Sequence, residues 1–266
     1  MSFVSQQPQS PLFFTLPLEI RQQIYAHLLP STTTITQDTS TKSRFPSLRS
    51  PFPSEYPSTD FLEKNFSDVR SKPIDNGIVW QRGCTSLLAV NKQMHFECAD
   101  QMYGTNTFVI NISYNCIKFA YRWIVLASNL MPNRDLPFLG FRIGYLARIR
   151  NYVVHVEQVD SYTGMVKYNC GGPGLPAGLR QQVSMLVSVM ASATESKPLH
   201  RLHIYLLDSN QGQIRRLRSI PIQAESNGKP WTVLDPFKVL RNVRMPTITG
   251  AVPFDYANGL QEAMQS

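Results

Sequence analysis

Charge is scarce in this sequence: Asp, Glu, Lys and Arg make up only 17% of its 266 residues. Acidic residues are the scarcer kind, at 18 against 26 basic ones, and the formal net charge is +8. The basicity is therefore an imbalance in a sparsely charged chain and not a polybasic composition. Residues 1–133 carry 11 basic and 9 acidic groups, which leaves 15 and 9 for residues 134–266, so the excess lies in the second half.

Cysteine and long apolar runs are also lacking. The 4 cysteines have no Cys-x-x-Cys spacing, and a chain that is 42% hydrophobic can build one large or two small cores without disulfides. The first residues lack a secretory signal, and the most apolar stretch, 117–131, contains Lys118 and Arg122 and is too short to span a bilayer. We expect a monomeric cytoplasmic or nuclear protein in a reducing compartment, without a membrane segment.

The first element predicted along the chain is a helix over residues 16–29. Pro17 suits the first turn, Glu19 suits the positive end of the helix dipole, and Pro30 ends the element. Residues 1–15 are predicted to be a disordered N-terminus. Residues 31–79 are rich in Ser, Thr and Pro and cannot bury enough surface to offset chain entropy, so we expect a mobile insertion.

Order is predicted to resume with a helix that Ser86 caps and Gly104 ends. A short strand follows at 108–112, where apolar residues alternate. Ile117, Ala120, Tyr121, Ile124 and Val125 then recur at helical spacing, which predicts an amphipathic helix that Pro132 closes.

The second half repeats an apolar-x-x-apolar-x-apolar unit. The unit starts at Ile149, Leu199 and Leu240, with a weaker copy at Thr105. Helical segments at 179–193 and 236–241 separate the last three copies. Strand, helix, strand at this period predicts an α/β fold in which residues 105–250 form an irregular, repeat-like sheet. Residues 251–266 are predicted to be a C-terminal tail.

Three sequence motifs then carry a resemblance. Residues 16–25 read LPLEIRQQIY, residues 87–93 read LLAVNKQ, and residues 103–108 read YGTNTF. The combination is similar to the large fungal F-box-like family, whose motifs run L-P-x-E-I-R-x-x-I-Y, L-L-x-V-N-[RK]-Q and Y-G-x-N-T-F. The resemblance covers residues 16–29 and 86–110 well, and beyond them it extends only to the pattern of irregular leucine-rich-repeat-like strands. It departs from an ordinary, compact F-box in the long insertion between its two halves.

The resemblance implies a substrate receptor of a cullin ubiquitin ligase, in which residues 16–104 form an F-box-like helical module that docks on a Skp adaptor. Carried over by position, the adaptor surface comprises Leu16, Pro17, Leu18, Ile20, Ile24, Leu28, Leu87, Leu88 and Val90. The alternative is that the same apolar stripe packs inward on the helix after Ser86 as core, with Glu19 as a capping carboxylate and Arg21 as a surface cation. Both interpretations hold together if Pro17 and Leu18 project outward while Ile20 and Ile24 face inward.

The repeat strands predict a second partner surface. The apolar positions expected to face the core are Tyr152, Val154, Leu202, Ile204, Val243 and Met245. Period-two alternation then turns their neighbours the other way, and lateral stacking aligns them in rows such as Asn111, His155 and Tyr205. The predicted partner-binding residues are Asn111, His155, His203, Tyr205 and Arg244. The alternative is that helices or the insertion cover this face.

The sequence gives little support for a catalytic, metal or cofactor site. Gly172, Gly174 and Ala177 fit a dinucleotide-binding spacing, but Pro173 and Pro176 remove backbone donors that a phosphate would need. His95, Cys98 and Cys84 lack a fourth ligand for zinc. Nucleophile and phosphate-loop motifs are absent from the sequence. We expect no enzyme, metal or cofactor.

The arginines of the second half suggest a different partner. Arg215, Arg216 and Arg218, together with Arg201, Arg241 and Arg244, could attract a phosphate backbone or an acidic protein. No aromatic residues are interleaved among them, so a solvated basic face or an acidic protein partner is favoured over nucleic acid. Taken together, the sequence predicts a non-enzymatic protein-interaction module, with a substrate-receptor role first and a ligase-independent scaffold or an acidic-partner binder as alternatives.

Overall fold

The computed structural model describes residues 12–34, 77–126, 129–130, 134–158, 174–194, 197–208 and 229–266. Its elements, with η for a 3-10 helix, begin with η1 (Leu12–Thr15), α1 (Leu18–Leu28), β1 (Ser31–Thr34), β2 (Ile78–Gln81), η2 (Thr85–Ala89), α3 (Lys92–Thr105), β3 (Thr107–Ser113) and β4 (Cys116–Tyr121). They continue with β5 (Ile124–Leu126), β6 (Asn129–Leu130), β7 (Arg134–Pro137), η3 (Phe138–Gly140), α4 (Ile143–Leu146), β8 (Asn151–Gln158), α6 (Gly174–Thr194), β9 (Arg201–Asp208), η5 (Pro230–Val239), β10 (Met245–Gly250) and α8 (Phe254–Gln265).

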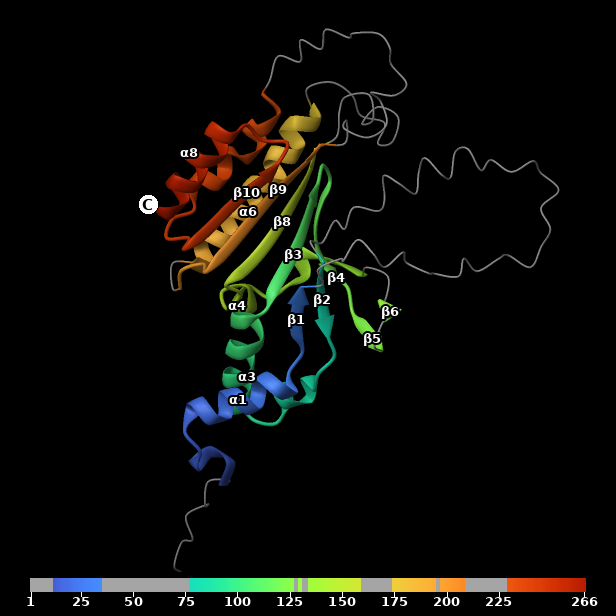
Figure 1. Ribbon diagram of the computed structural model, residues 1–266, viewed down its shortest axis with the longest axis vertical. Helices are drawn as coiled ribbons and strands as arrows, with labels where there is room; N and C mark the ends of the chain where they lie inside the picture. The colour runs from blue at the N-terminus through green and yellow to red at the C-terminus, as the bar shows by residue number, and fades with distance from the viewer. Residues whose placement is uncertain are drawn as a thin grey trace, which may run out of the picture.

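A six-stranded mixed sheet forms the body of the molecule, in the order β10-β9-β8-β3-β4-β7 (Figure 1). β3, β8, β9 and β10 are parallel, whereas β4 and β7 pair antiparallel on the other side of β3. Parallel neighbours need a crossover, and α6 lies in the connection from β8 to β9, as η5 does in that from β9 to β10. The α/β prediction is confirmed, and the repeat units that start at Ile149, Leu199 and Leu240 lead into adjacent strands.

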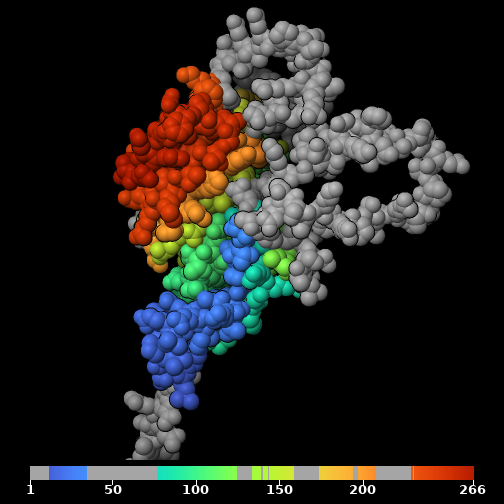
Figure 2. Space-filling model, in the orientation of Figure 1, coloured from blue at the N-terminus to red at the C-terminus, as the bar shows by residue number. Residues whose placement is uncertain are grey.

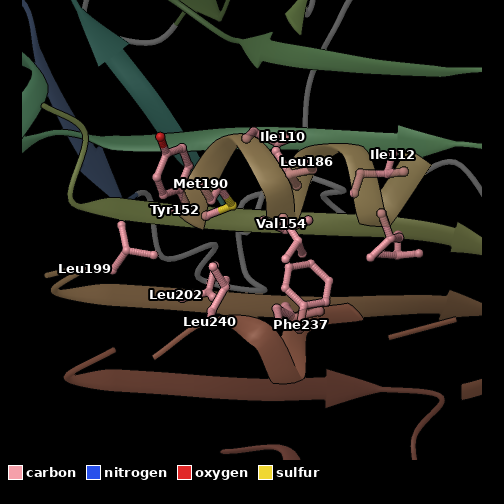
Figure 3. Packing of buried hydrophobic residues seen from close by; sticks show 14 of the residues in the cluster. Ile110, Ile112, Tyr152, Val154, Leu186, Met190, Leu199, Leu202, Phe237 and Leu240 are labelled. Atoms are coloured by element: carbon pink, nitrogen blue, oxygen red, sulfur yellow. The ribbon is translucent and has the colours of Figure 1, made fainter. Parts of the chain in front are cut away.

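One hydrophobic core lies between this sheet and its helices. The strands contribute Ile110, Val154 and Leu202 among others, and the helices contribute Leu186, Met190 and Phe237, all at most 2% exposed. Figure 3 shows these side chains converging from β3, β8, β9, α6 and η5. The residues that precede the strands, Ile149, Leu199 and Leu240, close the same cluster, as the apolar-x-x-apolar unit predicts.

The last repeat unit departs from the predicted alternation. Met245 is exposed, whereas Pro246 and Ile248 are buried opposite Leu202 and Ile204. The prediction that Met245 faces the core and Pro246 faces away is therefore wrong. The physical reason is that Asn242 has a positive φ of 58° and β10 begins only at Met245, so Val243 precedes the strand and does not set its phase.

The C-terminal segment is a helix that belongs to the core and not a tail. Ala257, Leu260 and Met264 of α8 lie on one face at helical spacing and join the main cluster. Tyr256 donates a hydrogen bond to Asp235 of η5 over 2.9 Å, which ties α8 to that element. The amphipathic spacing of the last residues could have indicated this helix from the sequence.

The helix predicted over 117–131 is instead a run of strands. β4 pairs antiparallel with β3 after a two-residue connection, and β5 pairs with β6. Ile117 and Phe119 of β4 alternate into the core, a period of two that the helical spacing of the same apolar residues concealed. On its other edge β4 pairs with β7, a strand that no sequence pattern indicated.

The N-terminal module lies at one end of the molecule. Figures 1 and 2 show α1, in blue, projecting from the end opposite α8, and α3 connecting it to the sheet. α3 begins after Asn91, whose side chain accepts from the Met94 amide at 2.8 Å, and not at Ser86, which lies in η2. The predicted mobile insertion, 31–79, contains all of Ser31–Thr34 and the first two residues of Ile78–Gln81, and these segments form the paired strands β1 and β2. Residues 1–11 and 35–76 lie outside the described residues.

Within the described ranges, none of the helices combines the length and the apolar character that crossing a bilayer requires.

Candidate functional site

A buried ion pair fixes α1 against α3. Arg21 donates from Nε and Nη2 to the two carboxylate oxygens of Glu97, over 2.9 and 2.8 Å. Tyr25 and Gln93 donate to the same carboxylate over 2.9 and 3.0 Å. Burial alone would raise the pKa of Glu97, but these donors outweigh it, and the net pKa is lowered. The sequence interpretation of Arg21 as a surface cation is wrong, since this residue is only 8% exposed.

This network explains the helical motifs of the sequence in structural terms. Arg21 and Tyr25 come from the first motif, Gln93 ends the second, and Glu97 follows one turn later. The Arg21 guanidinium also donates to the backbone oxygens of Phe14 and Leu16, which holds the chain before α1. The motifs thus encode how α1 docks, and the i, i+4 placement of Arg21 and Tyr25 was the signal available in the sequence.

The third motif builds a second junction. Asn106, only 4% exposed, donates to the Pro30 and Met102 backbone oxygens and accepts from the Thr32 amide at 2.6 Å. Thr32 Oγ1 in turn accepts from the Thr107 amide at 3.0 Å. β1, the end of α3 and the start of β3 are therefore joined through one buried amide, so α1 and the sheet are connected by ordered hydrogen bonds.

The inward and outward faces of α1 differ from the predicted ones. Arg21, Tyr25 and Leu29 form the inward stripe, and Tyr25 and Leu29 pack with Cys98 of α3. Ile20, at 42%, and Leu28, at 45%, are exposed, so the interpretation in which Ile20 faces inward is wrong. The predicted adaptor residues that are exposed are Leu16, Pro17, Leu18, Ile20, Leu28 and Val90.

The remaining predicted adaptor residues are less accessible. Ile24 is half-buried and lies between the exposed residues Ile20 and Leu28 along α1. Leu87 and Leu88 of η2 pack against the cluster of Tyr25, Leu29 and Cys98. The exposed part of the predicted surface therefore lies on and just before α1, except for Val90, which follows η2. Leu87 and Leu88 instead pack against the buried side of α1.

The polar row predicted on the sheet forms in register. Asn111, His155 and Tyr205 are direct neighbours on β3, β8 and β9. His155 Nδ1 lies 3.1 Å from Asn111 Oδ1, and the His155 and Tyr205 rings meet edge to face at 6.0 Å. His155 is only 2% exposed, and burial, followed by the nearby His203, lowers its pKa to about 4. A contact with a partner can therefore come from half-buried Tyr205 and Asn111, but not from His155 as it lies.

His203 and Arg244 do not join that row. His203 lies two residues before Tyr205 on β9, with its Nε2 2.7 Å from Thr249 Oγ1. Burial and the nearby Arg201 lower the pKa of His203. Arg244 precedes β10 and lies at the end of the sheet where the parallel strands begin. The five predicted partner-binding residues are thus divided between two places on the molecule.

A basic pocket occupies the strand-start end of the sheet, where Arg244 lies. It has a volume of about 590 Å³. Its lining comes from the end of α3 and the starts of β3, β8, β9 and β10: Gly104, Thr105, Thr107, Arg150, Asn151, Pro198, His200, Arg201, Arg244 and Met245. Arg201 and Arg244 were singled out in the sequence as part of a basic cluster, whereas Arg150 and His200 were missed. Arg241 instead donates to the Ala263 backbone oxygen, and Arg215, Arg216 and Arg218 lie outside the described residues.

Within the described residues, the side chains considered as zinc or dinucleotide ligands do not come together to form a binding site. His95 Nδ1 contacts the Leu88 oxygen at 2.7 Å and Nε2 lies 3.3 Å from Tyr145 Oη, while Cys98 is buried beside Tyr25. In the part of the chain that the structure describes, no three His, Cys, Asp or Glu side chains gather around a possible ion. Gly172 and Pro173 lie outside the described residues, and Gly174 begins α6.

Comparison with known proteins gives one similarity. The family described as Domain of unknown function (DUF7730) matches residues 5–135, a segment that ends inside β7. Searches of curated proteins and of solved structures gave no match.

Proposed function

We propose that the protein is a non-enzymatic protein-interaction module that docks on a Skp-type adaptor through the exposed apolar surface of α1. This surface consists of Leu16, Leu18, Ile20 and Leu28, which are 37% to 45% exposed. The partner class comes from the resemblance of the helical motifs to the fungal F-box-like family. The observation that carries the proposal is that these apolar side chains are exposed to solvent, and that α1 lies at a projecting end of the molecule (Figure 2).

The geometry of α1 supports docking in two ways. Ile20, Ile24 and Leu28 recur every four residues, so they form a continuous stripe along one flank of the helix. The adjacent stripe of Arg21, Tyr25 and Leu29 is anchored to α3. Because the helix is already fixed, a partner would not have to order it, and less conformational entropy would be lost on binding.

The proposed mechanism is positioning. The helical module would hold the ligase at one end, and the sheet with its α/β units would hold a target away from it, in the manner of a degenerate leucine-rich-repeat region. The ordered junction through Asn106 supports this arrangement, because it links α1 to β3 without a flexible joint. The β1–β2 pair between the two helical segments is the departure from an ordinary F-box.

The test is adaptor binding by a variant in which the apolar stripe carries charge. Ile20→Glu combined with Leu28→Glu places carboxylates where an apolar contact is proposed, and each would be desolvated without a partner. The double variant is expected to lower affinity for purified Skp adaptor by about tenfold or more, as truncated central contacts do at protein interfaces. Isothermal titration calorimetry with the full chain measures the change.

Gln22→Glu combined with Ala26→Glu is the matched control. Both positions are exposed on the flank of α1 that faces away from Ile20 and Leu28, and they lie about one turn apart. This variant should bind as the parent does, and circular dichroism should give both variants the parent melting temperature within a few degrees. If the parent does not bind adaptor while an authentic F-box does, the ligase role is overturned and the ligase-independent scaffold is the remaining function. If the parent and I20E/L28E bind adaptor with equal affinity, the assignment of the adaptor-binding surface to α1 is wrong.

A further inference from the structure

The basic pocket at the strand-start end of the sheet has a rigid frame. The amides of His200 and Arg201 donate to the Arg150 oxygen over 2.9 and 3.1 Å. The Arg244 and Met245 amides donate to the oxygens of Leu199 and His200, both over 3.0 Å. The backbones of Arg150, Arg201 and Arg244 are therefore held side by side by the first rungs of the parallel ladder, and the spacing of the three cations follows from the sheet.

The pocket wall beside Arg150, formed by Asn151 and the end of α3, is also ordered. Asn151 Nδ2 donates to the backbone oxygens of Gly104 and Thr105, over 3.2 and 3.3 Å. These oxygens belong to the C-terminal turn of α3, whose dipole corresponds to about half a negative charge. Part of that charge is capped by Asn151, and three guanidinium groups exceed it severalfold, so the pocket remains strongly positive.

The described residues give the arginines no acidic counter-ion in the pocket. Those that line it include three Arg and one His but no Asp or Glu. Asp100, one turn before Gly104 on α3, is already paired with Arg148 and with Lys197, the latter at 3.9 Å. Among the described residues, Arg150, Arg201 and Arg244 make no ion pair. Unpaired guanidinium groups with five donors each are suited to carboxylate and phosphate oxygens.

We propose that this pocket binds an anionic peptide segment of a partner protein, through adjacent carboxylates or a phosphorylated side chain. Both sources supply the same chemistry, namely several oxygen acceptors carrying about two negative charges. A pocket of this size receives one or two side chains. Nucleic acid suits it less, because the described lining has no Phe, Tyr or Trp to stack a base, and three cations within one pocket are fewer than a nucleic-acid backbone contacts along its length. The site is distinct from the α1 surface, so it stands whether or not α1 binds an adaptor.

The test uses three fluorescent peptides of one sequence background. One carries a run of Asp and Glu, one carries a phosphoserine flanked by Glu, and one carries Gln and Ser at those positions. Fluorescence anisotropy of each is measured against the full chain and against Arg201→Gln combined with Arg244→Gln, whose backbone hydrogen bonds remain. At least one anionic peptide is expected to bind, more tightly than the neutral one, and to lose affinity about tenfold or more in R201Q/R244Q.

Lys92→Gln combined with Lys229→Gln is the matched control for net charge. Both lysines are exposed; α3 separates Lys92 from the pocket by about 18 Å, and η5 separates Lys229 by a similar length. This variant is expected to keep the parent affinity, and whichever anionic peptide binds more tightly identifies the source. Equal binding of all three peptides, no binding of either anionic peptide, or equal losses in both double variants would overturn the proposal. So would tighter binding of a single-stranded oligonucleotide that R201Q/R244Q weakens.

Discussion

His155 shows how a polar residue in the sheet depends on its surroundings. Its position on β8 was predictable, because alternation along the strand sets the face and parallel pairing sets the neighbours. Its burial was not, since it depends on what lies over the row. With the proton on Nδ1, His155 donates to Asn111, and Nε2 remains buried without a hydrogen-bond partner in the described part of the chain. Such an arrangement favours the neutral ring.

This arrangement predicts a loss of stability on mild acidification. The pKa of His155 is about 4 in the folded chain and about 6.5 in an unfolded one, so the unfolded state takes up the proton first. The free energy of unfolding should therefore fall as the pH decreases from about 6.5 towards 4, by at most roughly 3 kcal/mol from this residue. Urea unfolding at pH 7, 6 and 5 measures the slope, and His155→Gln should flatten it. Equal slopes in parent and variant would contradict this account.

At the scale of elements, α1 is held by polar contacts to an unusual degree. Its inward stripe places Arg21 beside two apolar residues, and Glu97 must be charged to satisfy it. A buried guanidinium that loses its partner is costly, whereas a single lost hydrogen bond costs much less. Docking of α1 should therefore depend on the charge of Glu97 more than on any one donor to it.

Glu97→Gln tests that dependence. The substitution keeps the shape but leaves Arg21 without a counter-charge, and it is expected to lower the melting temperature by roughly 5–10 °C. Tyr25→Phe removes one donor only and should lower it by less. Glu19→Gln, which removes an exposed carboxylate from the first turn of α1, is the control and should change it by about 2 °C at most. Differential scanning calorimetry distinguishes the three, and similar values for E97Q and E19Q would show that the ion pair is unimportant.

Elements whose partners are local in sequence were predictable, and those that depend on distant pairing were not. α1 was found from apolar spacing and from Pro at its ends, and the helical segment predicted at 179–193 lies within α6. β4 was mistaken for a helix because Ile117, Ala120 and Tyr121 fit the helical period while Ile117, Phe119 and Tyr121 fit the period of two. Only pairing with β3 and β7 decides between the two periods. α8 was missed because its apolar residues are few, and their role is evident only once they are seen to pack into the core.

The candidate sites follow the same division. The sheet row could be predicted because the units that start at Ile149 and Leu199 repeat the same phase. The basic pocket could not, because it depends on residues just before or at the strand starts and on the end of α3. A signal was present: the two positions between the apolar residues are Arg150 and Asn151 in one unit and His200 and Arg201 in the next. Their convergence requires the parallel register, which the sequence does not specify.

At the scale of the whole molecule, the two halves of the chain share one core. The cluster extends from Trp80 and Phe108 in the first half to Leu260 and Met264 at the C-terminus. The family similarity ends at residue 135, inside β7, and β3 then pairs with β8, which lies beyond that limit. The matched segment therefore encodes the helical module and only one side of the sheet, and it does not by itself contain the helices that cover its apolar face.

A chain ending at residue 137 should consequently fail to fold. It retains β3, β4 and β7, but it loses β8 along one edge of β3 and loses α6 from the face that Ile110 and Ile112 present. An exposed apolar edge strand favours aggregation, and a sheet without its helical layer lacks a core. We expect no cooperative thermal transition by circular dichroism and poor dispersion of amide resonances, whereas the full chain should show one transition by near-UV and far-UV signals. A cooperative, dispersed 1–137 fragment would show that the segment is an independent domain, and the α1 surface could then act without the basic pocket.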